Sequence, residues 1–392
     1  MKYLRALGIV PLAVSLCACG SSSHSPTQRL GAFEPAGAMA GGRWTHAAAL
    51  LEDGRVLVFG GQTTGVVPSA LADLFDPNTN KFTATDSMTC TDDTGGMKSL
   101  LLADGRVLSM GGHDDCTSLY NPDTGKFADG PENPLVEVVL ALEPSGGLPA
   151  RPRIANMALA QLDDGRVLIA GGDYMASGGG TLASAALYDP KTGKSMSAGS
   201  MATARAGASA TRLPDGRVLI AGGFIFEKTG STSLHSTDLG TAELFDPESG
   251  KFTPTGSMSA PRSGQTALLL PDGRVLMVGG APAAELYDPR TGTFSKTSLT
   301  AKRDATVALL RDGRVLITGG TKDLDGQKRS IASAWIYDPT KDVLTPIGSM
   351  TSPRYGHTAT LLPDGRVLIA GGFDMDGLAH RSPLASAELY VP

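Results

Sequence analysis

The chain has 392 residues, of which 50 are Gly, 25 are Pro and only 5% are aromatic, a composition that favours short strands and turns over a helical bundle. Its formal net charge of −5 comes without a cluster of Lys and Arg, so it lacks the basic surface that binding to a phosphate backbone needs. We therefore expect an all-β protein that has no nucleic-acid partner.

Residues 1–19 have the pattern of an export signal. A short basic start with Lys2 and Arg5 precedes an apolar stretch that is too short to span a bilayer. The end of the stretch, Leu-Cys-Ala-Cys19, resembles a bacterial lipobox, in which the last cysteine is lipidated and becomes the new N-terminus. The alternative is an ordinary secretory peptide that is cut near Ala18. The resemblance implies a membrane-anchored protein, and the absence of Asp after Cys19 favours the outer membrane, facing the periplasm or the cell surface.

Residues 20–31 are rich in Gly, Ser and Pro and are expected to form a flexible tether ahead of a single domain, residues 32–392. With Cys17 removed and Cys19 lipidated, two cysteines remain in the mature chain. An even pair in an exported protein predicts a disulfide between Cys90 and Cys116, the alternative being two separate buried thiols.

One phrase, Asp-Gly-Arg-Val-Leu followed shortly by Gly-Gly, occurs seven times in that domain. Successive copies start 40 to 60 residues apart, which is the length of a four-stranded propeller blade. The copies begin at Asp53, Asp104, Asp164, Asp215, Asp272, Asp312 and Asp364.

Each repeat predicts four short strands joined by tight turns. An alternating run leads into the Asp-Gly turn, a buried Val-Leu strand ends at Gly-Gly, a third strand ends in aromatic-Asp-Pro, and a fourth follows a Thr-Gly-type turn. The last repeat stops at Pro392 after its third strand, while Ala32–Met39 matches the fourth-strand pattern with no repeat before it. We therefore predict a ring of seven four-stranded antiparallel blades that the N-terminal strand closes by completing the last blade.

The stretch Arg354-Tyr-Gly-His-Thr-Ala-Thr-Leu-Leu-Pro-Asp-Gly-Arg-Val-Leu-Ile-Ala-Gly-Gly372 resembles a kelch repeat of the bacterial form, similar to the propeller domain of galactose oxidase. The resemblance covers about residues 32–392 and implies a kelch-type β-propeller. It says little about function, because propellers carry many unrelated activities.

The two faces of such a propeller are expected to differ. The Asp-Gly and Thr-Gly turns on one face are uniformly short, whereas the links between the second and third strands, and those between blades, vary in length. Long variable loops on a rigid scaffold commonly carry binding sites, so we assign function to that second face, here called the loop face. The opposite face is the tight-turn face.

An arginine recurs near the start of the innermost strand, and two interpretations remain open. The arginines could ring the mouth of the central channel and attract an anionic ligand. Alternatively, each pairs within its own blade with an acid of the third strand, since Asp73, Glu243, Glu285 and Glu388 all occur in blades that have the arginine. Arg153 and Arg303, whose blades lack that acid, are the better ligand candidates. The six are Arg43, Arg153, Arg205, Arg262, Arg303 and Arg354.

His46 and His357 share one position, three residues after the arginine, in the first and seventh repeats. They could bind a transition metal, or be hydrogen-bonded histidines on inner strands; with no third ligand visible, no metal site is predicted. Trp44 and Tyr355, beside Arg43 and Arg354, complete the set of candidate ligand-binding residues at the channel mouth.

Resemblance to galactose oxidase also raises enzymatic interpretations. A copper-radical site would need a Cys-Tyr crosslink, an axial Tyr and two His ligands, and only Tyr355 with His46 and His357 could supply part of it. A sugar mutarotase is a second possibility, but spacing assigns no paired acid and base. We therefore predict no catalytic residue and no cofactor, and expect a binding or scaffolding module for a protein segment or a glycan.

Overall fold

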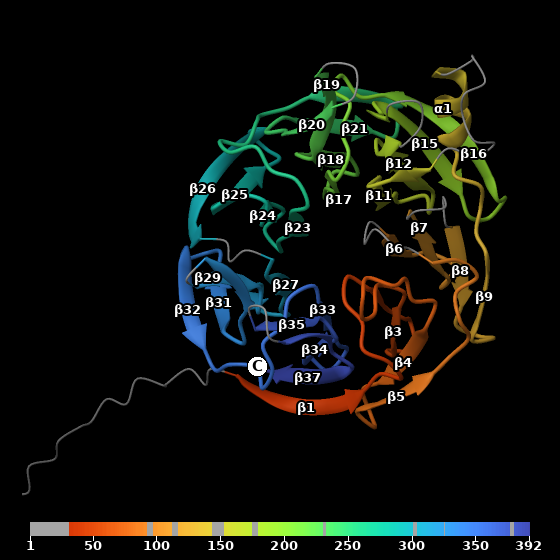
Figure 1. Cartoon of the computed structure of the whole chain (residues 1–392). Helices are drawn as coiled ribbons and strands as arrows, with labels where there is room; N and C mark the ends of the chain where they lie inside the picture. Colours follow the sequence, from red (N-terminus) through yellow and green to blue (C-terminus); the bar gives the residue numbers. More distant parts are fainter. Residues whose placement is uncertain are drawn as a thin grey trace, which may run out of the picture.

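The computed structural model describes residues 31–91, 97–111, 117–142, 153–174, 179–229, 233–300, 304–324, 326–376 and 380–392. Seven four-stranded antiparallel sheets are arranged as blades around a central axis (Figure 1). This confirms the predicted seven-bladed propeller. One helix accompanies the strands, α1 (Val136–Leu142), and none in these ranges has the length and hydropathy that a membrane span requires.

Every blade has its first strand at the axis and its last strand at the rim. Blade 1 contains β2 (Ala47–Leu50), β3 (Val56–Phe59), β4 (Ala72–Asp76) and β5 (Lys81–Ala84); blade 2 contains β6 (Lys98–Leu101), β7 (Val107–Met110), β8 (Thr117–Asn121) and β9 (Lys126–Asp129). Blade 3 contains β11 (Ala158–Gln161), β12 (Val167–Ala170), β15 (Ser184–Asp189) and β16 (Lys194–Ser200); blade 4 contains β17 (Ser209–Arg212), β18 (Val218–Ala221), β21 (Ala242–Asp246) and β22 (Lys251–Pro254). Blade 5 contains β23 (Thr266–Leu269), β24 (Val275–Val278), β25 (Ala283–Asp288) and β26 (Thr293–Thr300); blade 6 contains β27 (Thr306–Leu309), β28 (Val315–Thr318), β31 (Ala334–Asp338) and β32 (Val343–Ile347). Blade 7 contains β33 (Thr358–Leu361), β34 (Val367–Ala370), β37 (Ser386–Val391) and β1 (Ala32–Ala38).

The core lies between the blades. The second strand of each blade is buried along its whole length, as in β3, because both faces of a blade pack against neighbouring blades. Seven apolar clusters fill the seven seams between neighbouring blades. Near the rim, the aromatic residue of the third strand packs on one of the fourth, as Tyr287 does on Phe294 with ring centroids 4.8 Å apart.

The ring closes as the sequence predicts. Strand β1 pairs antiparallel with β37, with Phe33 opposite Tyr390 and their ring centroids 5.4 Å apart. The N-terminal strand therefore covers what would otherwise be an unpaired edge of blade 7.

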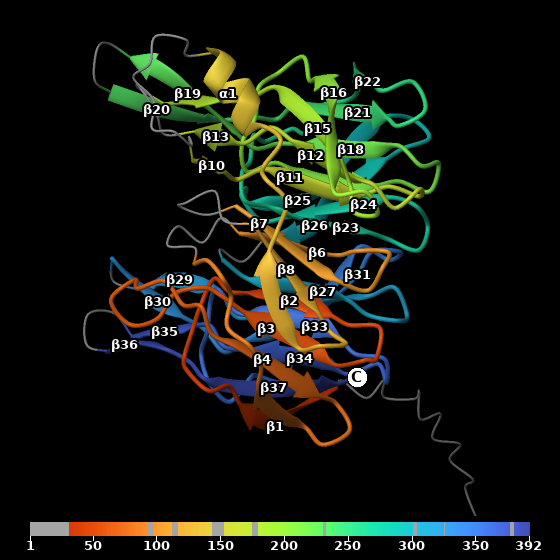
Figure 2. The same ribbon diagram turned by 90° about the vertical axis from the view of Figure 1, so that its right-hand side faces the viewer.

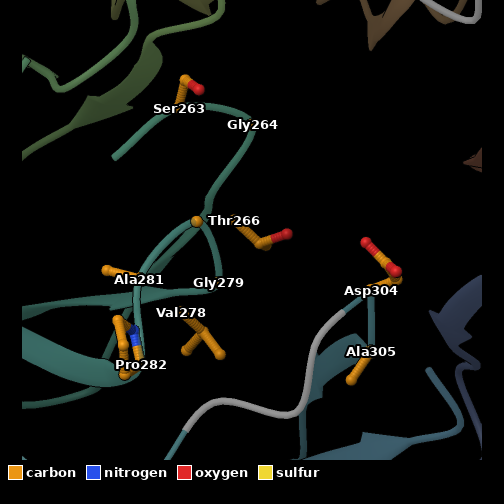
Figure 3. A pocket seen from close by; sticks show the side chains of 10 residues that line it. Ser263, Gly264, Thr266, Val278, Gly279, Ala281, Pro282, Asp304 and Ala305 are labelled. Atoms are coloured by element: carbon orange, nitrogen blue, oxygen red, sulfur yellow. The ribbon is translucent and has the colours of Figure 1, made fainter. Parts of the chain in front are cut away.

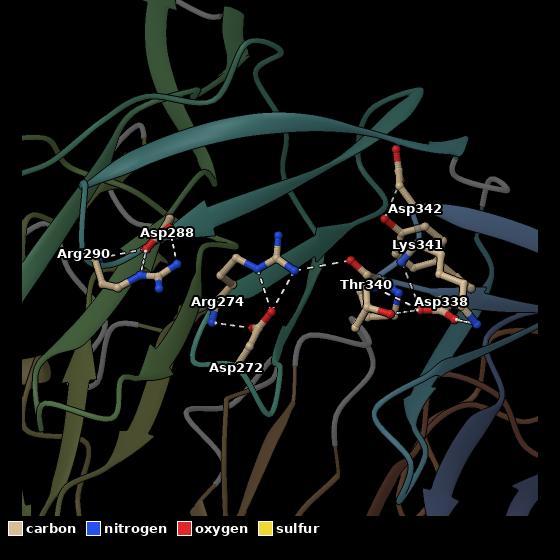
Figure 4. Close-up of polar contacts among 10 residues, drawn as sticks. Asp272, Arg274, Asp288, Arg290, Asp338, Thr340, Lys341 and Asp342 are labelled. Atoms are coloured by element: carbon tan, nitrogen blue, oxygen red, sulfur yellow. Dashed lines mark hydrogen bonds and ion pairs between the residues drawn. The ribbon is translucent and has the colours of Figure 1, made fainter.

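The Asp-Gly-Arg phrase forms the turn between the first two strands of each blade. In blade 5, Gly273 adopts a left-handed φ of 86°, and the Asp272 carboxylate accepts hydrogen bonds from the Arg274 backbone N–H (3.0 Å) and Nε (2.8 Å). Arg274 also donates to the carbonyl of Pro339 in blade 6 (3.3 Å; Figure 4). The Asp–Arg contact recurs at all seven turns, and Arg106 and Arg366 also donate to a carbonyl of the next blade.

The variable links gather on the other face, on the left in Figure 2. They form extra strands: β10 (Ile154–Ala155), β13 (Asp173–Tyr174), β14 (Gly180–Thr181), β19 (Phe224–Thr229), β20 (Ser233–Asp238), β29 (Thr321–Leu324), β30 (Gln327–Ser330), β35 (Phe373–Asp376) and β36 (His380–Pro383). The hairpins of blades 6 and 7 join into one sheet in the order β29-β30-β35-β36.

Candidate functional site

Four of the six arginines lie inside their blades and not at the channel mouth. Their exposed fractions are 0–1%, and each forms an ion pair with the acid of the third strand of its own blade. The pairs are Arg43–Asp73, Arg205–Glu243 (3.0 Å), Arg262–Glu285 (2.6 Å) and Arg354–Glu388 (2.8 Å). The alternative of pairing within each blade therefore holds for these four, and the prediction that Arg43 and Arg354 contact a ligand is corrected, because no ligand can reach them.

The pair in blade 4 shows what these charges do. Arg205 donates to the carbonyls of Gly222 and Thr241, both at 2.9 Å. The Glu243 carboxylate accepts the backbone N–H groups of Ala202 (2.7 Å) and Thr203 (3.1 Å). The ion pair thus connects the segment that enters the blade to the end of the second strand and the start of the third.

Arg153 does not occupy the buried position in blade 3. Each buried arginine is followed, two positions later, by a residue with a left-handed backbone, as Arg354 is by Gly356 (φ 60°). In blade 3 the left-handed residue is Asn156 (φ 55°). The residue two positions before it, in the place of the arginine, is therefore Ile154. Ile154 is fully buried, and Ala186 replaces the acid opposite it in the same apolar cluster. Arg153 is half-buried and makes contacts of its own.

Arg303 lies outside the described residues. Counted from Asp304, the left-handed residue of blade 6 (φ 58°), it falls one position later than the buried arginines. Trp335 occupies the acid's position on the third strand of this blade. A ligand-binding role for Arg153 and Arg303 stays a prediction.

The two histidines lie in the seams beside blade 7. His46 Nε2 is 3.1 Å from the Thr358 hydroxyl of blade 7, and His357 Nε2 is 2.9 Å from the Thr318 hydroxyl of blade 6. Burial, together with the charge of Arg43, lowers the pKa of His46 to about 3; burial and the charge of Arg354 also lower the pKa of His357. Both rings are neutral, buried and packed between blades, in agreement with the interpretation as hydrogen-bonded inner histidines. The prediction that they contact a ligand is corrected, because neither ring is accessible.

Trp44 and Tyr355 lie on the loop face and meet Phe373 in an aromatic trio across the seam between blades 1 and 7. The ring centroids are 5.2–5.8 Å apart. All three rings are half-buried, so their outer surface remains available for contact. Of the predicted ligand-binding residues, these two aromatics are the ones that the structure both brings together and leaves partly exposed.

A cavity of about 490 Å³ opens on the loop face between blades 5 and 6. Ser263, Thr266 and Asp304 supply polar side chains, and the backbone of residues 278–282 forms one wall (Figure 3). The Thr266 and Asp304 side chains face each other across the opening. Asp304 accepts a hydrogen bond from the Thr321 hydroxyl (2.7 Å) and lies 3.8 Å from Lys328 Nζ.

The cavity exists because blade 5 has the shortest link between its second and third strands, residues 279–282. The inner strands β23 and β27 also make less contact with each other than neighbouring inner strands make at the other six seams. No sequence motif pointed to this site. The short link was its signal, since a missing loop in a ring of longer ones leaves an opening.

Comparison with known proteins establishes the fold alone. No protein-family model matches the sequence, and no curated protein matches it. The structure is similar to that of a fungal alcohol oxidase of the AA5 family, solved in complex with copper, with a TM-score of 0.67 and 16% identity over 93% of this chain and 76% of that chain. The chain has the propeller fold of the AA5 oxidases.

The residues that could form a copper-radical site here do not converge. His46 and His357 turn into the seams and use Nε2 for threonine hydroxyls, while Tyr355 belongs to the aromatic trio. Within the described ranges, no group of three His, Cys, Asp or Glu side chains comes together. The donor set therefore does not fit copper of that kind.

The predicted processing and disulfide fall largely outside the described residues. Residues 1–30, with Cys19 and most of the tether, precede them, and Cys116 lies in a gap. Cys90 is disulfide-bonded, and its sulfur lies 3.1 Å from the Ser118 hydroxyl. The pairing of Cys90 with Cys116 stays a prediction.

Proposed function

We propose that this protein is an exported, lipid-anchored binding module that holds a protein segment or a glycan on its loop face. The observation that carries the proposal is the difference between the faces. The Asp-Gly-Arg side chains of the tight-turn face are engaged in the same contacts from blade to blade, as Arg55 with Asp53 (2.6 Å) and Arg314 with Asp312 (2.7 Å) show. The features that differ from blade to blade, namely the aromatic trio, the cavity between blades 5 and 6 and the hairpins, lie on the loop face.

Binding suits these features better than catalysis does. His46 and His357 are buried and neutral, so they supply no accessible acid or base. The cavity's volume of about 490 Å³ and its few convergent polar groups are within the range of known ligand-binding pockets. Because four of the six arginines are buried, binding of an anionic ligand would depend on Arg153 and Arg303.

Two arginine substitutions in blade 5, one on each face, test whether the ligand binds on the loop face. Thr266→Arg places a long side chain across the cavity, and Thr293→Arg places the same side chain at the exposed start of β26, next to a tight turn. The intact protein and both variants are tested against a glycan array and a library of displayed peptides. Loss of binding in Thr266→Arg alone supports the proposal, and equal loss in both variants, or no ligand of either class, contradicts it.

The anchor has its own test. Cells that express the protein are labelled with radioactive palmitate and fractionated. We expect label in the membrane fraction for the wild type and none for Cys19→Ala. A protein that is exported without label would contradict the lipid anchor.

A further inference from the structure

The Asp-Gly-Arg turns bring together, at seven places, the two groups of a spontaneous modification of proteins. An Asp-Gly sequence isomerises more readily than other sequences, because glycine has no side chain to hinder attack on the neighbouring carboxyl group. All seven turns lie among the described residues, and none of them adjoins a gap. The tight-turn face therefore carries seven Asp-Gly bonds whose reactivity can be judged from the structure.

The isomerisation has two steps. The backbone nitrogen of glycine attacks the side-chain carboxyl carbon of the preceding aspartic acid; a C–N bond forms, the C–O bond breaks, and the amide proton leaves with the hydroxyl group as water. Water then opens the cyclic imide at either carbonyl, which restores aspartate or gives isoaspartate, in which the main chain runs through the former side chain. The first step requires a protonated carboxyl group and a glycine amide that can leave its hydrogen bond.

The glycine amide is hydrogen-bonded in every one of these turns. In blade 4 the Gly216 N–H donates to the carbonyl of Leu213 (3.0 Å), and the equivalent bonds in the other six blades measure 2.9–3.0 Å. This hydrogen bond must break before the nitrogen can attack the carboxyl carbon. The turn itself is therefore a first barrier to the reaction.

The arginine engages both oxygens of the reacting carboxylate. Asp215 accepts the backbone N–H of Arg217 on one oxygen (3.1 Å) and Nε of Arg217 on the other (2.9 Å). The same two bonds occur at all seven turns, at 2.9–3.1 Å and 2.7–3.0 Å, and Figure 4 shows them at Asp272. Burial alone would raise the pKa of Asp215, but the hydrogen bonds from Arg217 outweigh burial and lower the pKa. The carboxylate is thus held in its ionised form, which is the unreactive one.

We propose that the arginine of each Asp-Gly-Arg turn protects the Asp-Gly bond before it from isomerisation, and that the aspartate becomes a site of isoaspartate formation when its arginine is lost. The proposal is independent of the binding function of the loop face. Among the described residues, the bond from this arginine to the next blade occurs at three of the seven turns, so it does not account for the repetition. Because isoaspartate lengthens the main chain of the turn by one carbon, it would disturb the pairing of the strands on either side, such as β17 and β18.

Arg217→Ala tests one turn while the other six serve as internal controls. It removes the guanidinium group and keeps the backbone N–H of residue 217. Arg290→Ala is the matched control, because Arg290 forms a similar ion pair with Asp288 (2.7 Å) on the same face, and the next residue, Pro289, has no N–H that could attack. The intact proteins are incubated below their melting transition and digested, and peptide mass mapping after chromatography separates isoaspartate from aspartate at each turn.

We expect Arg217→Ala to speed isoaspartate formation at Asp215 roughly threefold or more. The other six turns, and all seven turns of Arg290→Ala, should keep wild-type rates. A synthetic peptide of residues 211–220, which has no folded turn, should form isoaspartate at Asp215 roughly tenfold or more faster than the folded wild type.

A wild-type rate at Asp215 in Arg217→Ala would overturn the proposal, and so would an equal rise at all seven turns, because that would be a general loosening of the fold. Hydrogen exchange at the Gly216 amide separates the arginine from the turn. We expect this exchange to rise less than isomerisation does. Equal rises would assign the protection to the hydrogen bond of the glycine amide alone and overturn the role of the arginine.

Discussion

Arg205 and Glu243 form a buried ion pair in blade 4, at two positions that blade 3 fills with uncharged side chains. Arg205 is 1% exposed and Glu243 is 2% exposed, whereas Ile154 and Ala186 occupy the same two positions in blade 3 as part of an apolar cluster. The propeller therefore contains its own comparison between a buried ion pair and an apolar replacement.

Glu243→Ala is expected to lower the free energy of unfolding by about 3–5 kcal/mol, because it leaves Arg205 charged, buried and unpaired. It also removes the acceptor for the backbone N–H groups of Ala202 and Thr203. Arg205→Ile should cost a similar amount, since the Glu243 carboxylate then stays buried beside two backbone donors only. The double variant recreates the pair of blade 3 and leaves no buried charge, so its loss should be smaller than the sum of the single losses by about 1–3 kcal/mol.

Urea unfolding followed by far-UV circular dichroism gives all four values of this cycle. A matched control is Arg217→Ala in the same blade, where Arg217 and Asp215 form an ion pair (2.7 Å) on the tight-turn face with side chains 36% and 46% exposed. Its loss should stay under about 1 kcal/mol. Additive losses in the cycle, or a Glu243→Ala loss no larger than the control, would refute the reasoning that the pair acts as one buried unit.

Three further predictions concern the seams and the disulfide. The pKa of His46 is lowered to about 3 in the folded state, so its contribution to the free energy of unfolding is complete above about pH 6.5 and is lost as the pH falls toward 3. At pH 5 this one residue should already lower the free energy of unfolding by about 2 kcal/mol. Urea titrations of the wild type and His46→Gln at both pH values check this, and equal losses in the two proteins would contradict it. Gly371→Ala should destabilise by about 2–4 kcal/mol, because φ is 63° and a Cβ would lie 2.6 Å from His46 Cε1, whereas Gly250→Ala, with a φ of 67° and no atom within 4 Å of the Cβ, should cost about 1 kcal/mol; similar melting temperatures would dismiss the contact. Non-reducing peptide mass analysis should find Cys90 joined to Cys116, and a free thiol at Cys116 would disprove the pairing.

The fold could be predicted almost completely from the sequence because its repeats are local. An Asp-Gly turn between apolar strands specifies a hairpin wherever it occurs, and seven copies leave few alternatives to seven blades. The closing strand could also be predicted, because Ala32–Met39 has a fourth-strand pattern and the last blade lacks one. The observed pairing of Phe33 with Tyr390 confirms it.

The site was harder to predict, because similar motifs occupy different environments. Arg153 precedes its inner strand much as Arg205 does, yet a shift of one residue places Ile154 in the buried position. The sequence does not reveal this shift, because the left-handed residue that marks the register can be located only in the structure. Likewise, His46 and His357 share a position that suggested a pair, but each is directed into a different seam.

By itself, the sequence determined the blades, their number, the closure of the ring and the contrast between a uniform face and a variable one. These follow from turn chemistry and alternation, which act over a few residues. Only the tertiary structure decided which polar groups remain accessible, because burial depends on neighbouring blades. It buried four arginines in ion pairs, and it brought Thr266 and Asp304 together around a cavity beside the blade with the shortest link.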